Sequence, residues 1–389
     1  MLRKLISLLL SATALGVAAD DFVRVEGGRF MLGDSVYTFR GTNLWYAPLL
    51  AANDRDRLAS ELDALQALGI DNLRVLVGAE GSLPNESHIQ PTLLTAPGVY
   101  DEALLAGLDF FVGELERRGM KGVFYLTNSW EWSGGYGAYL EWSGHGPTPT
   151  SRAAGYNDYV AYASQFVLEP AAMQMYYDHV RSIVPRYAGS PGVMAWQIAN
   201  EPRAFSRAGK PALAQWIAES AALIKSLDPN HLVSTGSEGS VGCELDIDLW
   251  AQIHADPNID YATIHCWPKN WQWPDGEEAR MTGEYVREHR ALTPKPLVLE
   301  EFGFPRDGGS YNPESTTLAR DEYYRFVFSL ADEPGLLQGV NFWGWSGSAR
   351  PEGEWWLPGA PYTVDPAHER QGLYSVFDTD STVELIKRQ

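Results

Sequence analysis

Short apolar segments alternate with longer amphipathic segments along almost the whole of this 389-residue chain. Each apolar segment ends in polar residues, as a buried strand does at the edge of a sheet, and the segments between them repeat apolar residues at helical spacing. The pattern predicts strands at residues 37–41, 70–77, 123–126, 193–199, 232–235, 262–265, 296–300 and 339–343. Eight strands separated by helices predict an α/β fold, a (β/α)8 barrel of the TIM type.

The predicted helices have apolar faces and defined ends. The first repeats leucine at helical spacing before a glycine that can end it (Leu58, Leu62, Leu65, Leu68, Gly69). Others are expected near residues 104–115, 170–184, 211–227, 279–291 and 315–332. Residues 22–33, with Gly27-Gly28 between two alternating segments, predict a short N-terminal β-hairpin that plugs the barrel bottom. No linker or internal repeat interrupts the pattern, so residues 20–389 are predicted to form a single domain.

Residues 1–19 have the pattern of a signal peptide. Arg3 and Lys4 precede an apolar stretch, and small residues lead to Asp20, where the mature chain is expected to begin. The apolar stretch is too short for the alternative, a membrane anchor. We therefore expect a secreted protein, extracellular or periplasmic, without a membrane partner once the signal is removed.

Charge and aromatic content narrow the choice of partners. Lys and Arg total 30 against 50 Asp and Glu, which gives a net charge of −20. Such a charge repels polyphosphates, so we do not expect nucleic acid as a partner. The acidic surface also leads us to expect a monomer. The 14 Trp and 19 Tyr exceed what a core usually needs, and aromatic rings stack on the C–H faces of sugars. Stretches rich in Gly, Pro, Trp and Tyr at 78–98, 129–168 and 266–278 follow strands, at the end where barrel active sites lie.

Two predicted strands end in acidic residues. Residues 193–199 lead into Asn200-Glu201-Pro202, where Pro202 ends the strand, and residues 296–299 lead into Glu300-Glu301. Strand alternation places the last two side chains on opposite sides, one toward the cleft and one into the wall. Cleavage of a glycosidic bond requires a carboxylic acid and a carboxylate on opposite sides of the sugar. Glutamates on two non-neighbouring strands therefore indicate a glycoside hydrolase site.

The segments around these glutamates resemble a known family. Residues 195–203, Ala-Trp-Gln-Ile-Ala-Asn-Glu-Pro-Arg, are similar to the acid/base signature of glycoside hydrolase family 5, and residues 299–303, Leu-Glu-Glu-Phe-Gly, to its nucleophile strand. The resemblance covers essentially the whole mature chain and indicates the β-mannanase branch. It implies a retaining enzyme with Glu201 as acid/base, Glu301 rather than Glu300 as nucleophile, and β-mannan or manno-oligosaccharides as substrate.

The resemblance also implies roles for residues around the two glutamates. Arg74 would keep the nucleophile ionised, and Asn200 would donate to the sugar 2-hydroxyl. Five further positions match substrate-binding residues of the family: Asn128, Trp130, His265, Trp267 and Trp343.

One position departs from the family, and the cysteines leave one question open. Trp267 stands where many members carry a tyrosine that donates toward the nucleophile, so this chain offers only an indole N–H there. Cys243 and Cys266 follow neighbouring strands, and in an exported protein they could form a disulfide. The sequence alone does not decide whether this disulfide forms.

No cofactor or metal is expected, because the histidines lack ligand-like spacing and this hydrolysis requires no metal. A serine hydrolase is disfavoured by the lack of a Gly-x-Ser-x-Gly elbow. An exo-acting β-mannosidase, with the loops at 129–168 and 266–278 closing one end of the cleft, and a β-1,4-glucanase remain open alternatives. A non-catalytic carbohydrate-binding protein is a remote one, because both carboxylates are present.

Overall fold

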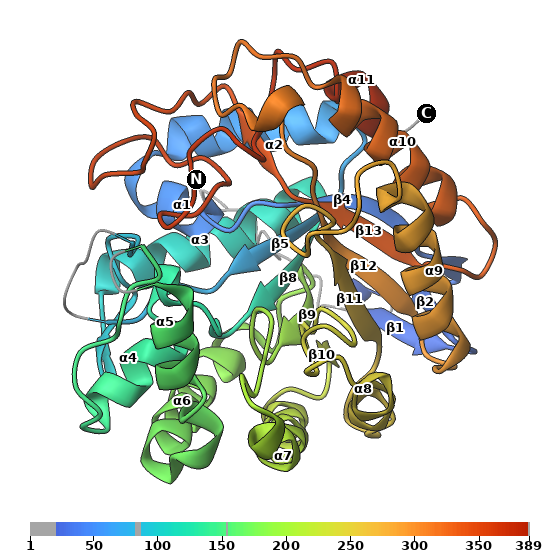
Figure 1. Cartoon of the computed structure of the whole chain (residues 1–389). Coiled ribbons are helices and arrows are strands. Elements are labelled where there is room, and N and C mark those ends of the chain that lie inside the picture. Colours follow the sequence, from blue (N-terminus) through green and yellow to red (C-terminus); the bar gives the residue numbers. More distant parts are fainter. Residues whose placement is uncertain (1–20, 82–86, 153–154, 388–389) are drawn as a thin grey trace, which may run out of the picture.

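An eight-stranded parallel barrel surrounded by helices forms the centre of the structure, a computed structural model that describes residues 21–81, 87–152 and 155–387 (Figure 1). The barrel strands are β4 (Phe39–Asn43), β5 (Asn72–Leu76), β8 (Lys121–Tyr125), β9 (Val193–Gln197), β10 (Leu232–Ser234), β11 (Ala262–Cys266), β12 (Leu297–Phe302) and β13 (Gly339–Phe342). They occupy the predicted places along the chain, and the predicted (β/α)8 barrel is confirmed. The predicted signal peptide lies outside the described residues.

The barrel has one seam. The ladder order is β10-β9-β8-β5-β4-β13-β12-β11, so β10 and β11 are its edges. Bonds from the ends of these strands bridge them: the Asp260 backbone N–H donates to the Val233 carbonyl (2.8 Å), and the Thr263 hydroxyl donates to the Ser237 carbonyl (3.0 Å). These bonds satisfy backbone groups that an open edge would leave exposed.

The helices that the sequence predicts all occur, and their ends follow ordinary capping chemistry. For example, the carboxylate of Asp101 accepts from the first turn of α3, and Gly119 ends this helix in a left-handed conformation (φ 66°). The helices are α1 (Ala47–Asn53), α2 (Arg55–Ala67), α3 (Glu102–Arg118), α4 (Gly135–Trp142), α5 (Tyr156–Ala163), α6 (Pro170–Ile183), α7 (Lys210–Leu227), α8 (Ile247–His254), α9 (Glu278–Ala291), α10 (Leu318–Ala331) and α11 (Val383–Ile386). Short 3-10 helices are η2 (Glu131–Ser133), η3 (Phe166–Leu168), η4 (Val184–Tyr187), η5 (Arg207–Gly209) and η6 (Asp307–Gly309).

Sequence patterning missed α1, α4, α5, α8 and α11. Each has eight residues or fewer, which is too short for a clear apolar stripe. In α4 the first six residues are all buried, so the helix has no polar face that would reveal its period.

The predicted N-terminal hairpin is confirmed. Strands β1 (Val23–Glu26), β2 (Arg29–Leu32) and β3 (Ser35–Val36) form a small antiparallel sheet. Val23 and Phe30 are buried in a cluster with residues at the N-terminal ends of barrel strands, among them Phe39 and Leu232. The hairpin therefore closes the barrel at the end opposite the predicted site.

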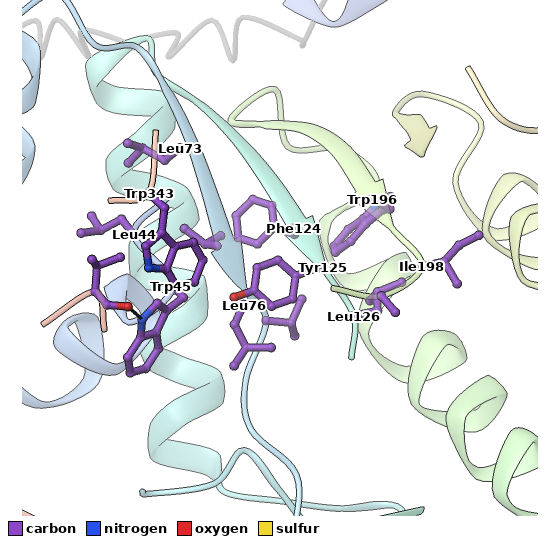
Figure 2. Close-up of a cluster of buried hydrophobic side chains, with 14 of the residues drawn as sticks. Leu44, Trp45, Leu73, Leu76, Phe124, Tyr125, Leu126, Trp196, Ile198 and Trp343 are labelled. Carbon is purple, nitrogen blue, oxygen red and sulfur yellow. Dashed lines mark hydrogen bonds between the residues drawn. The ribbon is translucent and has the colours of Figure 1, made fainter. Parts of the chain in front are cut away.

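Large apolar side chains fill the space between the barrel and its helices. Figure 2 shows part of this core. Two indoles, Trp45 and Trp343, lie on one side of the view with Leu73 and Leu76 of β5, and residues of β8, β9 and the chain just beyond them extend the cluster away from the indoles. Trp45 is buried, and its N–H donates to the carbonyl of Val364 (2.7 Å), far along the chain.

The long segment after β13 had no predicted structure. It contains β14 (Trp345–Gly347), which pairs with β15 (Val376–Phe377), and runs beside α1 and α2 (Figure 1, orange to red). A second small sheet, β6 (Leu94–Ala96) with β7 (Val99–Tyr100), lies before α3. Two residues of α2 bind the segment after β13: Arg57 donates to the Tyr362 carbonyl (2.7 Å), and Glu61 accepts from the Trp345 indole (2.6 Å). The segment is thus fixed to the barrel at several points.

The disulfide that the sequence left open is not formed. Cys243 and Cys266 are both buried and free. Side chains alternate along β11, so Cys266 points toward Thr282 of α9 while its neighbour His265 points into the barrel. Burial raises the pKa of the Cys266 thiol well above its ordinary value.

None of the helices in the described part of the chain has the length and apolar character that crossing a bilayer requires.

Candidate active site

A cavity of about 470 Å³ opens at the C-terminal ends of the barrel strands. Its walls come from loops after most of the strands: Trp130, Trp132, Ser151, Tyr156, Asn200, Glu201, Arg203, Glu238, Trp267, Asn270, Trp271, Gln272, Glu301, Trp343, Pro366, His368 and Glu369. Both predicted catalytic glutamates lie on its surface. The loops at 129–168 and 266–278 supply many of the aromatic residues, as their position after strands predicts.

Glu201 and Glu301 converge from β9 and β12, which are not neighbours in the barrel. One carboxylate oxygen from each, together with a ring nitrogen of His265, lie within 4.8 Å of one another. Glu201 follows the strand in a left-handed conformation (φ 49°), which costs energy in a residue with a Cβ. The chain therefore aims this carboxyl into the cavity at the expense of local strain.

Arg74 of β5 forms the floor beneath Glu301. The guanidinium is completely buried and forms an ion pair with the Glu301 carboxylate through Nη1. Its remaining N–H groups donate to the side chains of Gln197 (2.8 Å) and Asn200 (2.8 Å). A buried guanidinium fixed on several sides holds a carboxylate in place.

Glu201 receives two different ring donors. The Trp130 indole donates to its Oε2 (2.6 Å), and His265 Nδ1 lies 2.8 Å from its Oε1. Burial, assisted by the charge of Arg74, lowers the pKa of His265 well below its ordinary value, so the imidazole is neutral. Because Nε2 has no hydrogen-bond partner among the described residues, the ring proton belongs on Nδ1, which donates to Glu201.

Burial raises the pKa of both glutamates. The positive charge of Arg203 opposes this for Glu201; for Glu301 the charge of Arg74 opposes it and the nearby charge of Glu201 adds to it. Because the two carboxyls interact, the pair titrates together and retains one proton when an isolated glutamate would be ionised. The ion pair with Arg74 favours the charged form of Glu301.

Glu300 does not lie where strand alternation predicts. Instead of pointing into the outer wall, its carboxylate accepts from Gln197 Nε2 inside the barrel (2.6 Å) and lies 3.7 Å from Arg74. The register of β12 against β13 shifts between Leu299 and Phe302, and such a bulge breaks the alternation of side chains. Both adjacent glutamates can therefore face inward, but only Glu301 reaches the cavity.

The predicted binding residues fall into two groups. Asn200, Trp130, Trp267 and Trp343 line the cavity, whereas Arg74, Asn128 and His265 lie behind its surface, fully buried. The Asn128 side chain accepts from the Asn200 amide (3.1 Å) and donates to the hydroxyl of Ser133 (3.0 Å). The Trp267 indole donates to Glu301 Oε2 (3.1 Å), so the indole N–H acts where many family members use a tyrosine hydroxyl.

Sequence reasoning missed two parts of the wall. Glu238, in the run Ser237-Glu238-Gly239 after β10, forms an ion pair with Arg203. Its position at the end of a predicted strand is a sequence signal that could have identified it as a cavity residue. Pro366, His368 and Glu369 belong to the segment after β13, and no pattern in that segment indicated that it returns to the cavity.

Glu201, His265 and Glu301 are close enough to share a cation. Glu301 is already paired with the buried Arg74 guanidinium, which would repel a second positive charge. Hydrolysis by two carboxyl groups needs no metal, so a site without metal or cofactor stays our prediction.

A buried carboxyl supports the loop that carries Trp130. Glu80, after β5, accepts from the backbone N–H of Gly135 (3.1 Å), and its own backbone N–H donates to the Ser133 carbonyl (2.8 Å). No cation forms an ion pair with Glu80 among the described residues. Burial raises the pKa of Glu80 from 4.5 to about 8.

The raised pKa of Glu80 predicts that the free energy of unfolding decreases as the pH rises from about 4.5 to about 8. The folded state keeps a proton that the unfolded chain has lost, so the stabilisation is full below pH 4.5 and disappears as the pH rises through about 8. Glu80→Gln, a neutral isostere, should flatten the fall in Tm between these pH values. Melting curves of this variant and of Glu288→Gln, an exposed control on α9, would test it. Parallel wild-type and Glu80→Gln profiles would contradict the assignment.

Comparison with known proteins agrees with the geometry. Residues 20–389 match the family model described as glycoside hydrolase family 5 beta-mannosidase-like. Mannan endo-1,4-beta-mannosidase 1 of Oryza sativa subsp. japonica is 28% identical over 361 residues, which cover 85% of this chain and 80% of that protein. The glycoside hydrolase family 5 mannosidase from Rhizomucor miehei is 31% identical with a TM-score of 0.86, covering 95% and 97% of the two chains, and a mutant of it has been solved in complex with mannosyl-fructose.

The endo-1,4-beta-D-mannanase from Thermotoga petrophila RKU-1, at 22% identity, shares the fold with a TM-score of 0.71 over 90% of this chain and 98% of that one. With a family match over nearly the whole chain and two glutamates converging on one cavity, this chain belongs to glycoside hydrolase family 5, in its beta-mannosidase-like group, and is a glycoside hydrolase.

Proposed function

We propose that this protein hydrolyses β-1,4-mannosidic bonds in mannan, glucomannan or manno-oligosaccharides with retention of the anomeric configuration. The observation that carries the retaining mechanism is the approach of the two carboxylates, with oxygens within 4.8 Å of one another. Retaining enzymes place the two carboxyl groups roughly 5–5.5 Å apart, whereas inverting enzymes leave roughly 6.5–9.5 Å for a water molecule.

In the first step Glu301 attacks the anomeric carbon while Glu201 gives its proton to the departing oxygen. The glycosidic bond breaks and an ester joins Glu301 to the sugar. Esterification removes the negative charge of Glu301, so the pKa of Glu201 falls and its carboxylate can act as a base. It takes a proton from water, whose oxygen attacks the anomeric carbon and releases Glu301.

The assigned residues support each step. Arg74 and the Trp267 N–H bind Glu301 and keep it charged for attack. One N–H of the Asn200 amide is bonded to Asn128, and its second can donate to the sugar 2-hydroxyl. The indole of Trp343 lines the cavity and supplies an aromatic face on which a sugar ring can stack.

The choice of mannan rests on the relatives, whose names give mannan or mannosides as substrates. The test is hydrolysis of matched β-1,4-mannan and β-1,4-glucan oligosaccharides, with proton NMR of the first product formed. We expect faster cleavage of the mannan series and initial release of the β-anomer. Initial release of the α-anomer would exclude the retaining mechanism, and faster glucan cleavage would exclude the substrate.

An exo-acting β-mannosidase is the second candidate, and the segment after β13 favours it. This segment is fixed to α2 and brings Pro366, His368 and Glu369 into the cavity wall, a third wall beside the two predicted loops. Burial in that wall and the charges of Asp365 and Glu201 raise the pKa of Glu369. A carboxyl there can accept from sugar hydroxyls, and it can also donate to them when it is protonated.

The two modes differ in their products. An exo-acting enzyme releases only mannose from mannohexaose at early times, whereas an endo-acting enzyme releases mannobiose and mannotriose. Chromatography of a time course on borohydride-reduced mannohexaose also shows which end is attacked.

Secretion, a mature domain of residues 20–389 and a monomeric state belong to the same proposal. Mass spectrometry of the exported protein, with a mature N-terminus at Asp20, would support the first two. Light scattering would test the third.

A further inference from the structure

Glu238 is a buried carboxylate on the cavity wall that takes no part in the mechanism above. It follows β10 and has 1% of its surface exposed. Both of its oxygens accept from Arg203: Oε1 from Nη2 (2.6 Å) and Oε2 from Nε (2.5 Å). A bidentate pair of this kind fixes the plane and position of the guanidinium.

Arg203 connects this carboxylate to the acid/base. Its guanidinium lies over the Trp130 ring, 5.3 Å from the ring centroid, and the Trp130 N–H donates to Glu201 Oε2 (2.6 Å). The rings of Tyr159 and Phe205 also pack against the indole, at centroid distances of 6.1 and 5.4 Å. The indole is thus in contact with a fixed cation and with a packed aromatic cluster.

We propose that Glu238 is a positioning residue for the acid/base: it clamps Arg203, which in turn holds the Trp130 indole in its hydrogen bond to Glu201. The proposal rests on the assignment of Glu201 made under Proposed function. It extends that assignment to two residues, Arg203 and Glu238, which form an ion pair with each other in the cavity wall.

The same pair sets the charge that Glu201 experiences. The charge of Arg203 lowers the pKa of Glu201, and the carboxylate of Glu238 offsets part of that charge. The other titratable groups facing Glu201 come from every side of the cavity: Arg74 of β5, Tyr125 of β8, Tyr156 of α5, His265 of β11, Glu301 of β12, and His368 and Glu369 of the segment after β13. Replacing Glu238 or Arg203 removes none of these groups, although the pair also acts through its charges on Tyr156, His265 and Glu301.

The test is the pH dependence of kcat/KM with mannotriose, whose basic limb reports the acid/base of the free enzyme. Glu238→Gln removes a negative charge and leaves Arg203 unopposed, so the basic limb should move about one pH unit lower. Removing both charges, in Glu238→Gln with Arg203→Met, should return the limb toward its wild-type position. A role in folding alone would lower activity without moving the limb in these directions.

Controls separate this effect from general damage. Glu244→Gln removes a charge from the same loop outside the pair and should leave the profile unchanged. Glu238→Asp keeps the negative charge on a shorter side chain. Its basic limb should stay at the wild-type pH while kcat/KM falls several-fold. This variant also tests the proposal if Glu238→Gln does not fold stably. A limb that stays in place in Glu238→Gln, or moves in Glu238→Asp, overturns the proposal. If azide still rescues Glu201→Ala, only this inference fails and the proposed function stands.

Discussion

Glu301→Ala is expected to lower kcat on manno-oligosaccharides roughly 10⁵-fold, the scale seen when a covalent nucleophile is removed. Glu301 is the carboxylate that Arg74 and Trp267 hold at the cavity surface, and no other carboxylate in the described cavity wall has both contacts. Azide can enter the space left by the side chain and attack an activated aryl β-mannoside directly. The rescued product should therefore be the α-mannosyl azide, formed with one inversion.

The adjacent glutamate is a matched control. Glu300→Gln should keep activity within roughly tenfold and show no azide rescue, because Glu300 is hydrogen-bonded to Gln197 inside the barrel and does not reach the cavity. A large loss with α-azide formation in Glu300→Ala, but not in Glu301→Ala, would reverse the assignment of the two residues.

Glu201→Gln is expected to have an effect that depends on the leaving group. With mannotriose, whose departing oxygen needs a proton, kcat/KM should fall roughly 10³-fold, within the range for a general acid. With a dinitrophenyl β-mannoside, which leaves as a stable anion, kcat/KM should fall less than about tenfold. Steady-state kinetics on the two substrates, with Tm measured alongside, would check this.

Azide again gives a stereochemical readout. In Glu201→Ala the glycosyl-enzyme still forms from the activated substrate, and azide then attacks it with a second inversion, so the product should be the β-mannosyl azide. Equal losses on both substrates would show that Glu201 is not the proton donor.

The barrel was predictable because its elements are repetitive and local. A buried strand such as residues 193–199 is apolar except for Gln197, and a helix such as α3 has an apolar stripe between a capping aspartate and a glycine. These signals come from neighbours in the chain. They do not exist for α4, whose buried residues show no period, or for the segment after β13, whose place is set by contacts with α2.

The candidate site divides in the same way. Glu201 and Glu301 could be found because strand ends and short motifs surround them, whereas Glu369 could not, because its neighbours in the chain give no sign that it reaches the cavity. Glu300 shows the limit of a local rule: a bulge in β12 turned its side chain inward, against the alternation that the sequence predicts.

The sequence by itself determined the barrel, its family and the two carboxyl groups, since each is encoded in short runs whose periodicity or motif survives without distant contacts. Only the tertiary structure decided which side chains stand behind the surface and which line it, how Arg203 and Glu238 meet beside Trp130, and how closely the two catalytic carboxyl groups approach. These properties depend on burial and on charges brought together from strands far apart in the chain, and such proximity exists only after the barrel has closed.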